Sequence, residues 1–138
     1  MGTPRLWLCL PPTIFALGDY VMTMWWQPAG YWAGDYDAAC EGNPVVLWCM
    51  TVHPAAFHGL TFLWIAVFSL FIVKAPRILA LMASLSITFS HAFCTGTWLY
   101  THPNGFFWAL AMCIGCAILF VLALERSRED AAWRSPGA

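Results

Sequence analysis

Four long apolar segments, separated by polar stretches, dominate the sequence. They cover residues 6–26, 54–73, 78–100 and 106–124. Each is close to the roughly 20 apolar residues that an α-helix needs to cross a hydrocarbon core about 30 Å thick. Backbone groups inside lipid must be bonded within their own segment, and the alternating pattern of a membrane strand is absent. The segments therefore predict transmembrane helices.

The polar stretches between the segments set the predicted topology. A long loop covers residues 27–53, tight links cover 74–77 and 101–105, and a charged tail covers 125–138. Short links join antiparallel neighbours, so the sequence predicts an all-α, integral membrane four-helix bundle that forms one domain over residues 1–138. We expect the tail to form a short cytoplasmic helix that frays toward its end.

Composition indicates that lipid surrounds most of the chain. Of the 138 residues, 61% are hydrophobic and 9% are charged, whereas about a quarter of the residues in an ordinary soluble domain are charged. So few charges cannot cover the surface of a soluble domain of this length. The net charge of −1 and the lack of a basic run give no reason to expect nucleic acid as a partner.

The basic residues predict the orientation, because they all fall on one side of a four-span arrangement. They are Arg5, Lys74, Arg77, Arg126, Arg128 and Arg134. The opposite side carries Asp35, Asp37, Glu41 and His102. By the positive-inside rule, both termini and the 74–77 link lie in the cytoplasm. A cleaved signal peptide is the competing interpretation of the first span, but Asp19 interrupts its apolar run.

The loop over residues 27–53 has local structure of its own. Asn43-Pro44 is typical of an N-cap followed by proline at the first helical position. The apolar run 45–52 then predicts either a short helix at the outer interface or an extension of the second span, kinked at His53-Pro54. Aromatic residues crowd this region, as an interfacial belt or as a surface that holds a partner protein, pigment or lipid. They are Trp25, Trp26, Tyr31, Trp32, Tyr36 and Trp48.

Two pairs of cysteines lie close together in the sequence and could have a structural or chemical role. Cys40 and Cys49 lie in the outer loop, where either a disulfide or two separate thiols is consistent with the sequence. Cys113 and Cys116 form a C-x-x-C spacing inside the fourth span, where we expect packing residues rather than a metal or redox site.

The most informative residues are the ionisable ones inside the spans. Asp19, His58 and His91 all fall in the outer half of the membrane if the four spans alternate in direction. Because such groups are costly in hydrocarbon, they usually face the protein interior and a partner. A stripe of polar residues at helical spacing, Ser84, Thr88, His91, Thr95 and Trp98, supports this arrangement on the third span. The sequence thus predicts a converging Asp19–His58–His91 cluster, which Glu41, His53, Thr95, Trp98 and His102 could support.

Several chemistries suit such a cluster. An Asp–His hydrogen bond could simply hold the helices together. Two imidazoles and a carboxylate also match a zinc or iron ligand set. A proton or ion path is a third interpretation, and a tetrapyrrole bound through His91 as axial ligand is a fourth.

Two short motifs carry a resemblance. Asp19-x-x-x-Thr23 in the first span, and Glu41-Gly42-Asn43-Pro44 before an apolar segment, resemble a pattern in small uncharacterised prokaryotic membrane proteins, classed as domains of unknown function. The likeness covers about the first half of the chain. It implies several short spans and the inner membrane of a bacterium or archaeon, and it implies no activity.

The sequence therefore favours a non-catalytic integral membrane subunit or accessory protein of a larger assembly. Its partners would be the lipid bilayer and other membrane subunits or further copies of itself. The first alternative is a small membrane metal-binding protein or metalloenzyme that uses Asp19, His58 and His91. A small transporter whose path follows the polar stripe, or a tetrapyrrole-binding subunit, is the further alternative.

Overall fold

The computed structural model describes residues 5–100 and 103–133, and helices account for its regular structure. The elements are α1 (Leu6–Trp25), α2 (Ala29–Trp32), the 3₁₀ helix η1 (Tyr36–Ala38), α3 (Pro44–Val52), α4 (Pro54–Lys74), α5 (Arg77–Tyr100) and α6 (Gly105–Trp133). No strand occurs in the described ranges. Four helices, α1, α4, α5 and most of α6, are long and apolar enough to cross a membrane, which confirms long apolar helices at the four predicted positions.

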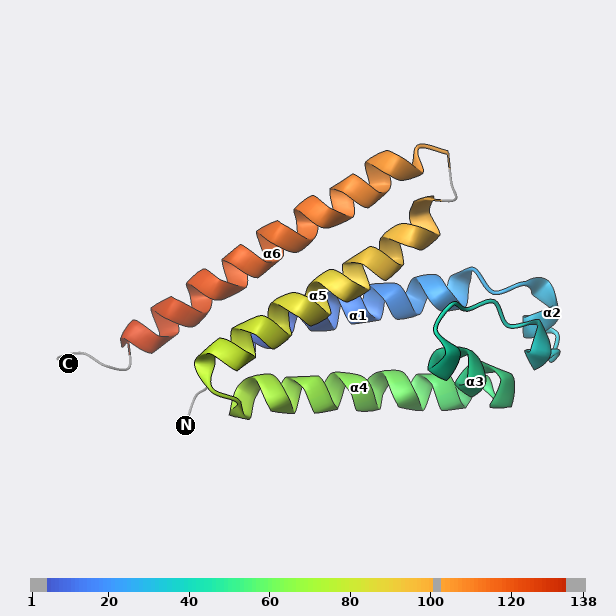
Figure 1. The fold of residues 1–138 in the computed structure, drawn as a ribbon, viewed down its shortest axis with the longest axis horizontal. Coiled ribbons are helices and arrows are strands. Elements are labelled where there is room, and N and C mark those ends of the chain that lie inside the picture. The colour runs from blue at the N-terminus through green and yellow to red at the C-terminus, as the bar shows by residue number, and fades with distance from the viewer. Residues whose placement is uncertain (1–4, 101–102, 134–138) are drawn as a thin grey trace.

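Three of the four long helices pack against one another, and the fourth, α4, diverges from α5. α1, α5 and α6 contact one another, whereas α4 contacts α1 and α5 and, among the described residues, shares no contact with α6. Figure 1 shows α4 and α5 leaving their tight link in diverging directions, with α1 behind α5. A core of buried residues ties α4 to α1 and α5 near that link, and it consists of Leu8, Cys9, Ala16, Phe68, Ile72 and Ala80.

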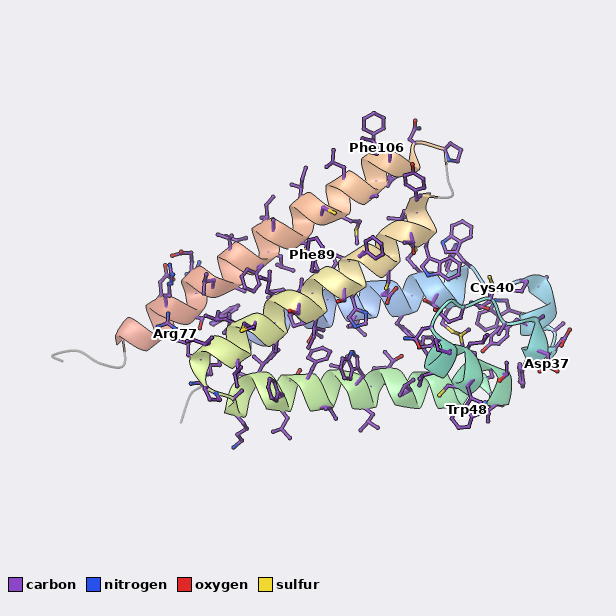
Figure 2. All side chains as sticks on the ribbon, in the orientation of Figure 1. Asp37, Cys40, Trp48, Arg77, Phe89 and Phe106 are labelled. Atoms are coloured by element: carbon purple, nitrogen blue, oxygen red, sulfur yellow. The ribbon has the colours of Figure 1, made fainter. Side chains whose placement is uncertain are left out.

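The two ends of the molecule differ in character. The start of α1, the α4–α5 link and the end of α6 lie together (Figure 1), and we call this the basic end. Figure 2 shows Arg77 at this end, and it shows Asp37, Cys40 and Trp48 at the opposite, loop end. Arg134 and His102 lie outside the described residues. The cytoplasmic location of the basic end stays a prediction.

A proline in α1 explains one contact between helices. Pro12 has no N–H, so it cannot donate to the carbonyl of Leu8 one turn earlier. Ser84 on α5 supplies the missing donor, with its Oγ 2.6 Å from that carbonyl oxygen. Ser84 is fully buried. In a membrane, where no water can satisfy a freed carbonyl, this bond lets α1 carry a proline in its interior.

The loop contains more helix than the sequence predicted. α3 is a separate helix, because His53 between α3 and α4 is extended (φ −177°, ψ 144°). Asn43 Oδ1 caps α3 by accepting from the amides of Val45 (3.0 Å) and Val46 (3.4 Å), as the Asn43-Pro44 pair predicted. The short helices α2 and η1 were not predicted.

One glutamine fixes the path of the loop. The Gln27 side chain donates to the Cys40 carbonyl (2.9 Å) and accepts from the Cys40 amide (2.8 Å), and it also donates to the Thr23 carbonyl. Beneath this connection lies a second buried cluster, made of Met24, Tyr31, Cys49, Met50 and Phe57. Burial raises the pKa of the Tyr31 hydroxyl above its usual value. The loop is therefore a packed cap on the loop end.

The α5–α6 turn tolerates only glycine at one position. Asn104 adopts a left-handed conformation (φ 65°), and Gly105 follows it. A Cβ on Gly105 would lie 2.5 Å from the Tyr100 carbonyl oxygen, so any side chain there would force the turn open.

The described part of the tail is helical, as predicted, and it continues the fourth long helix. α6 runs without a break from Gly105 to Trp133. Good helix formers continue past the apolar segment, and exposed ion pairs join Arg126 to Glu129 (2.9 Å) and Arg128 to Glu125 (3.3 Å) at helical spacing. Such pairs each add only about 0.3–0.5 kcal/mol. Residues 125–133 contain no helix-breaking residue, so α6 continues past its apolar segment.

Candidate functional site

A cavity of about 620 Å³ lies between α1, α4 and α5, in the wedge where α4 and α5 diverge. The segment from Glu41 to Val46 closes it at the loop end. Its lining combines carboxylates, an imidazole, hydroxyls and a set of aromatic rings. The residues are Ala16, Asp19, Tyr20, Thr23, Glu41, Gly42, Asn43, Val45, Val46, Phe57, Leu60, Thr61, Trp64, Ser90, His91, Phe93, Cys94, Thr97 and Trp98.

Three of these side chains form a continuous chain of hydrogen bonds. His91 Nδ1 lies 2.9 Å from Asp19 Oδ2, and Trp64 Nε1 lies 3.2 Å from His91 Nε2. An indole N–H can only donate, so Nε2 must be the unprotonated nitrogen. The ring proton is then on Nδ1, where it is donated to Asp19. His91 is thus a neutral imidazole with both nitrogens engaged, and it links α1, α4 and α5.

The predicted three-residue cluster forms only in part. The structure brings Asp19 and His91 together, but His58 lies beside Tyr20, with its Nδ1 2.9 Å from the Tyr20 hydroxyl. His58 does not line the cavity. In the described parts of the chain, no three His, Cys, Asp or Glu side chains are grouped so that they could hold a metal ion. The zinc or iron ligand set inferred from Asp19, His58 and His91 is therefore not assembled.

The residues that were expected to support the cluster lie in different places. Glu41 lines the cavity, and its Oε1 accepts from the Asn43 amide at 2.8 Å. His53 instead caps α4 by accepting from the Ala55 amide (3.0 Å), outside the cavity lining. Thr95 is buried and donates to the His91 carbonyl (2.9 Å), so it supports the helix rather than the site. Trp98 lines the cavity, and His102 lies outside the described residues.

Sequence reasoning missed Trp64 and Tyr20. The signal for Trp64 was present, because Phe57, Thr61 and Trp64 are three and four residues apart and share one face of α4. His58 is one residue beyond Phe57, about 100° around the helix, and so it turns out of the cavity.

Both cysteines of the outer loop are free thiols in the structure, and the disulfide between them stays a prediction. Cys40 and Cys49 are both free, Cys40 exposed and Cys49 buried in the cluster beneath α3. Gln27 holds the backbone of Cys40, while Cys49 packs into the core. Cys116 is buried against Phe15 and Ala92, as expected for a packing residue.

The cavity carries two carboxylates and is partly open to the surroundings of the protein. Among the residues that the structure describes, its lining contains Asp19 and Glu41 but no Lys or Arg. Exposed apolar side chains frame its opening: Trp64 is 44% exposed, Phe93 65% and Val45 58%. The Asp19 and His91 side chains are 18% and 22% exposed, so a molecule in the cavity could reach them.

Comparisons with known proteins add no identification: no family model, curated protein or solved structure matches this chain. The fold and the cavity define it as a helical membrane protein with four apolar helices long enough to span the bilayer. The resemblance to small prokaryotic membrane proteins stays a prediction.

Proposed function

We propose that this chain is a non-catalytic membrane protein that acts as an accessory, ligand-holding subunit of a larger membrane assembly. With the basic end in the cytoplasm, as the charge pattern predicts, the cavity lies in the outer half of the bilayer. The observation that carries the proposal is the engagement of both nitrogens of His91, by Asp19 on one side and by Trp64 on the other.

The Asp19–His91 pair resembles the arrangement by which a carboxylate orients a catalytic imidazole. In a hydrolase, the far nitrogen would face a nucleophilic hydroxyl or thiol and accept its proton. Here that nitrogen accepts from the Trp64 indole, which cannot act as a nucleophile. The same bond occupies the lone pair that a metal or a tetrapyrrole iron would need. The geometry thus suits a rigid cavity wall better than a base or an axial ligand.

Two surfaces support a place in an assembly. The packed loop carries Trp32 and Trp48 with 55% and 66% of their surface exposed. α6 buries only 11% of its apolar span within the chain, against 39% for α1. Lipid, other subunits or further copies of this chain would cover these surfaces.

The test is extraction in a mild detergent, followed by measurement of particle mass and metal content. We expect a protein mass well above the 15.4 kDa of one chain and no stoichiometric metal. A monomer that contains one zinc or iron per chain, lost in His91→Ala, would overturn the proposal in favour of a metalloprotein. An absorbance spectrum of a bound haem or chlorophyll that disappears in the same variant would favour the tetrapyrrole alternative.

A further inference from the structure

We infer that the cavity binds an amphipathic organic cation, such as a quaternary ammonium compound or a protonated amine with an apolar body, which enters from the lipid. This inference rests on the proposed ligand-holding function and names the class of ligand. It depends on the charge, the aromatic lining and the opening of the cavity.

The charge of the cavity has no internal counterpart. Asp19 accepts from a neutral imidazole, and Glu41 accepts from a backbone amide. Neither bond brings a positive charge, and no Lys or Arg lines the cavity in the described ranges 5–100 and 103–133. Two carboxylates in a partly apolar site attract a cation strongly and repel an anion, because the low dielectric weakens screening.

The aromatic lining favours an organic cation over a bare metal ion. Tyr20, Phe57, Trp64, Phe93 and Trp98 all line the cavity. Aromatic rings attract cations through their quadrupoles, and cages of such rings bind quaternary ammonium groups. A metal ion would instead need several oxygen or nitrogen ligands at short range, and no such group of side chains is assembled in the described residues.

Size and opening point to an amphipathic molecule. The volume of about 620 Å³ lies within the roughly 300–1,000 Å³ typical of small-molecule pockets. Exposed Trp64, Phe93 and Val45 frame the opening, and in a membrane these side chains contact lipid. A ligand dissolved in the outer leaflet could therefore enter between α4 and α5, with its charge directed at Asp19 and its apolar part against the rings.

Tetraphenylphosphonium and tetraphenylborate test the inference, because they have the same shape and opposite charges. Binding of each would be measured by equilibrium dialysis with the purified full chain in uncharged maltoside micelles, which carry no competing lipid head group. We expect saturable binding of one tetraphenylphosphonium per chain. Asp19→Asn and Glu41→Gln should each weaken it about tenfold or more, the change that a loss of about 1.4 kcal/mol produces.

Each substitution replaces a carboxylate by an amide of the same shape, and the control lies outside the cavity lining. Glu41→Gln keeps an oxygen that can accept from the Asn43 amide, so it removes charge without removing the bond. Asp37→Asn, at an exposed carboxylate of η1 that does not line the cavity, is the control and should leave binding unchanged. If Asp19→Asn fails to fold, Glu41→Gln decides alone.

Cys94 supplies a second measurement within the wall of the cavity. In a variant that lacks the exposed Cys40 and Cys113, a cationic trimethylammonium methanethiosulfonate should modify Cys94 faster than the anionic sulfonate analogue does. Glu41→Gln should lower that rate ratio several-fold.

The inference is overturned if tetraphenylphosphonium binding does not saturate, if it depends equally on Asp37, or if Asp19→Asn and Glu41→Gln weaken tetraphenylborate binding as they weaken tetraphenylphosphonium binding. Saturable binding of a neutral amphiphile alone would also overturn it while leaving the ligand-holding function intact. Stoichiometric metal would instead remove the proposed function itself, so the two failures are distinguishable.

Discussion

Trp64 decides which nitrogen of His91 carries the proton. Its indole Nε1 lies 3.2 Å from His91 Nε2, which leaves Nδ1 to donate to Asp19. Because Trp64 comes from α4, the helix that diverges from α5, this bond also joins the two helices within the cavity lining. Local geometry on a neighbouring helix thus sets both the protonation state of the site and its shape.

Replacing Trp64 by phenylalanine should remove the hydrogen bond that keeps the ring proton of His91 on Nδ1. In the native protein, we expect ¹⁵N spectra of labelled histidine to show the His91 proton on Nδ1. In Trp64→Phe, the freed Nε2 can bind water or take up a proton, so its ¹⁵N signal should move. Trp48→Phe, at an exposed tryptophan of α3, is the control. An unchanged His91 signal in Trp64→Phe would contradict the assigned hydrogen bond.

Ser84→Ala should destabilise the protein in a way that depends on Pro12. Alone, it leaves the Leu8 carbonyl without a donor, and we expect the free energy of unfolding to fall by about 1 kcal/mol. Pro12→Ala restores a backbone N–H that can reach this carbonyl, so the cost of Ser84→Ala should shrink in that background. The free energy of unfolding in mixed detergent would be measured for the native protein, the two single variants and the double variant. Together they form a double-mutant cycle.

The control for this cycle is Ser86→Ala, which changes an exposed serine of the same helix. It should have little effect in either background. Equal costs of Ser84→Ala with and without Pro12 would show that the serine does not compensate for the proline.

Gln27→Ala should loosen the packed loop without disturbing the spans. It removes both side-chain bonds to the Cys40 backbone, and leaving such groups unpaired costs about 1–3 kcal/mol. We expect hydrogen exchange at the Cys40 amide to accelerate about tenfold or more, and the buried Cys49 thiol to become reactive. Asp37→Ala, at an exposed side chain, should change neither, and slow exchange in Gln27→Ala would contradict this role.

Labelling of Cys40 tests both the orientation and the thiol state of the loop. In a variant that lacks the other exposed cysteines, Cys94 and Cys113, a membrane-impermeant maleimide added to intact cells should modify Cys40, and the addition of Cys40→Ser should abolish the labelling. A cysteine introduced by Lys74→Cys should react only after the membrane is opened, because the basic end is expected in the cytoplasm. The opposite pattern would reverse the topology, and labelling of Cys40 only after reduction would indicate a disulfide.

The sequence predicted the features that depend on a short stretch of chain. The spans follow from apolar length, and the cap of α3 follows from Asn43-Pro44, because both are decided by neighbouring residues and the solvent. Asp19 and His91 were paired correctly because depth in the membrane could be counted along each helix. A helical tail was also predicted, but its continuity with the fourth span was not, because charge was taken as the end of the apolar segment.

Only the tertiary structure decided how the helices are turned and what their side chains meet. His58 lies at a suitable depth along α4. The rotation of α4 about its own axis, however, places His58 against Tyr20 and Trp64 against His91. A helix turns by about 100° per residue, so the neighbour that a side chain meets depends on packing among all the helices. The sequence by itself therefore determined a lipid-embedded helical protein with ionisable residues at one level. Their partners, and the electronegative cavity between them, came from the way α1, α4 and α5 pack.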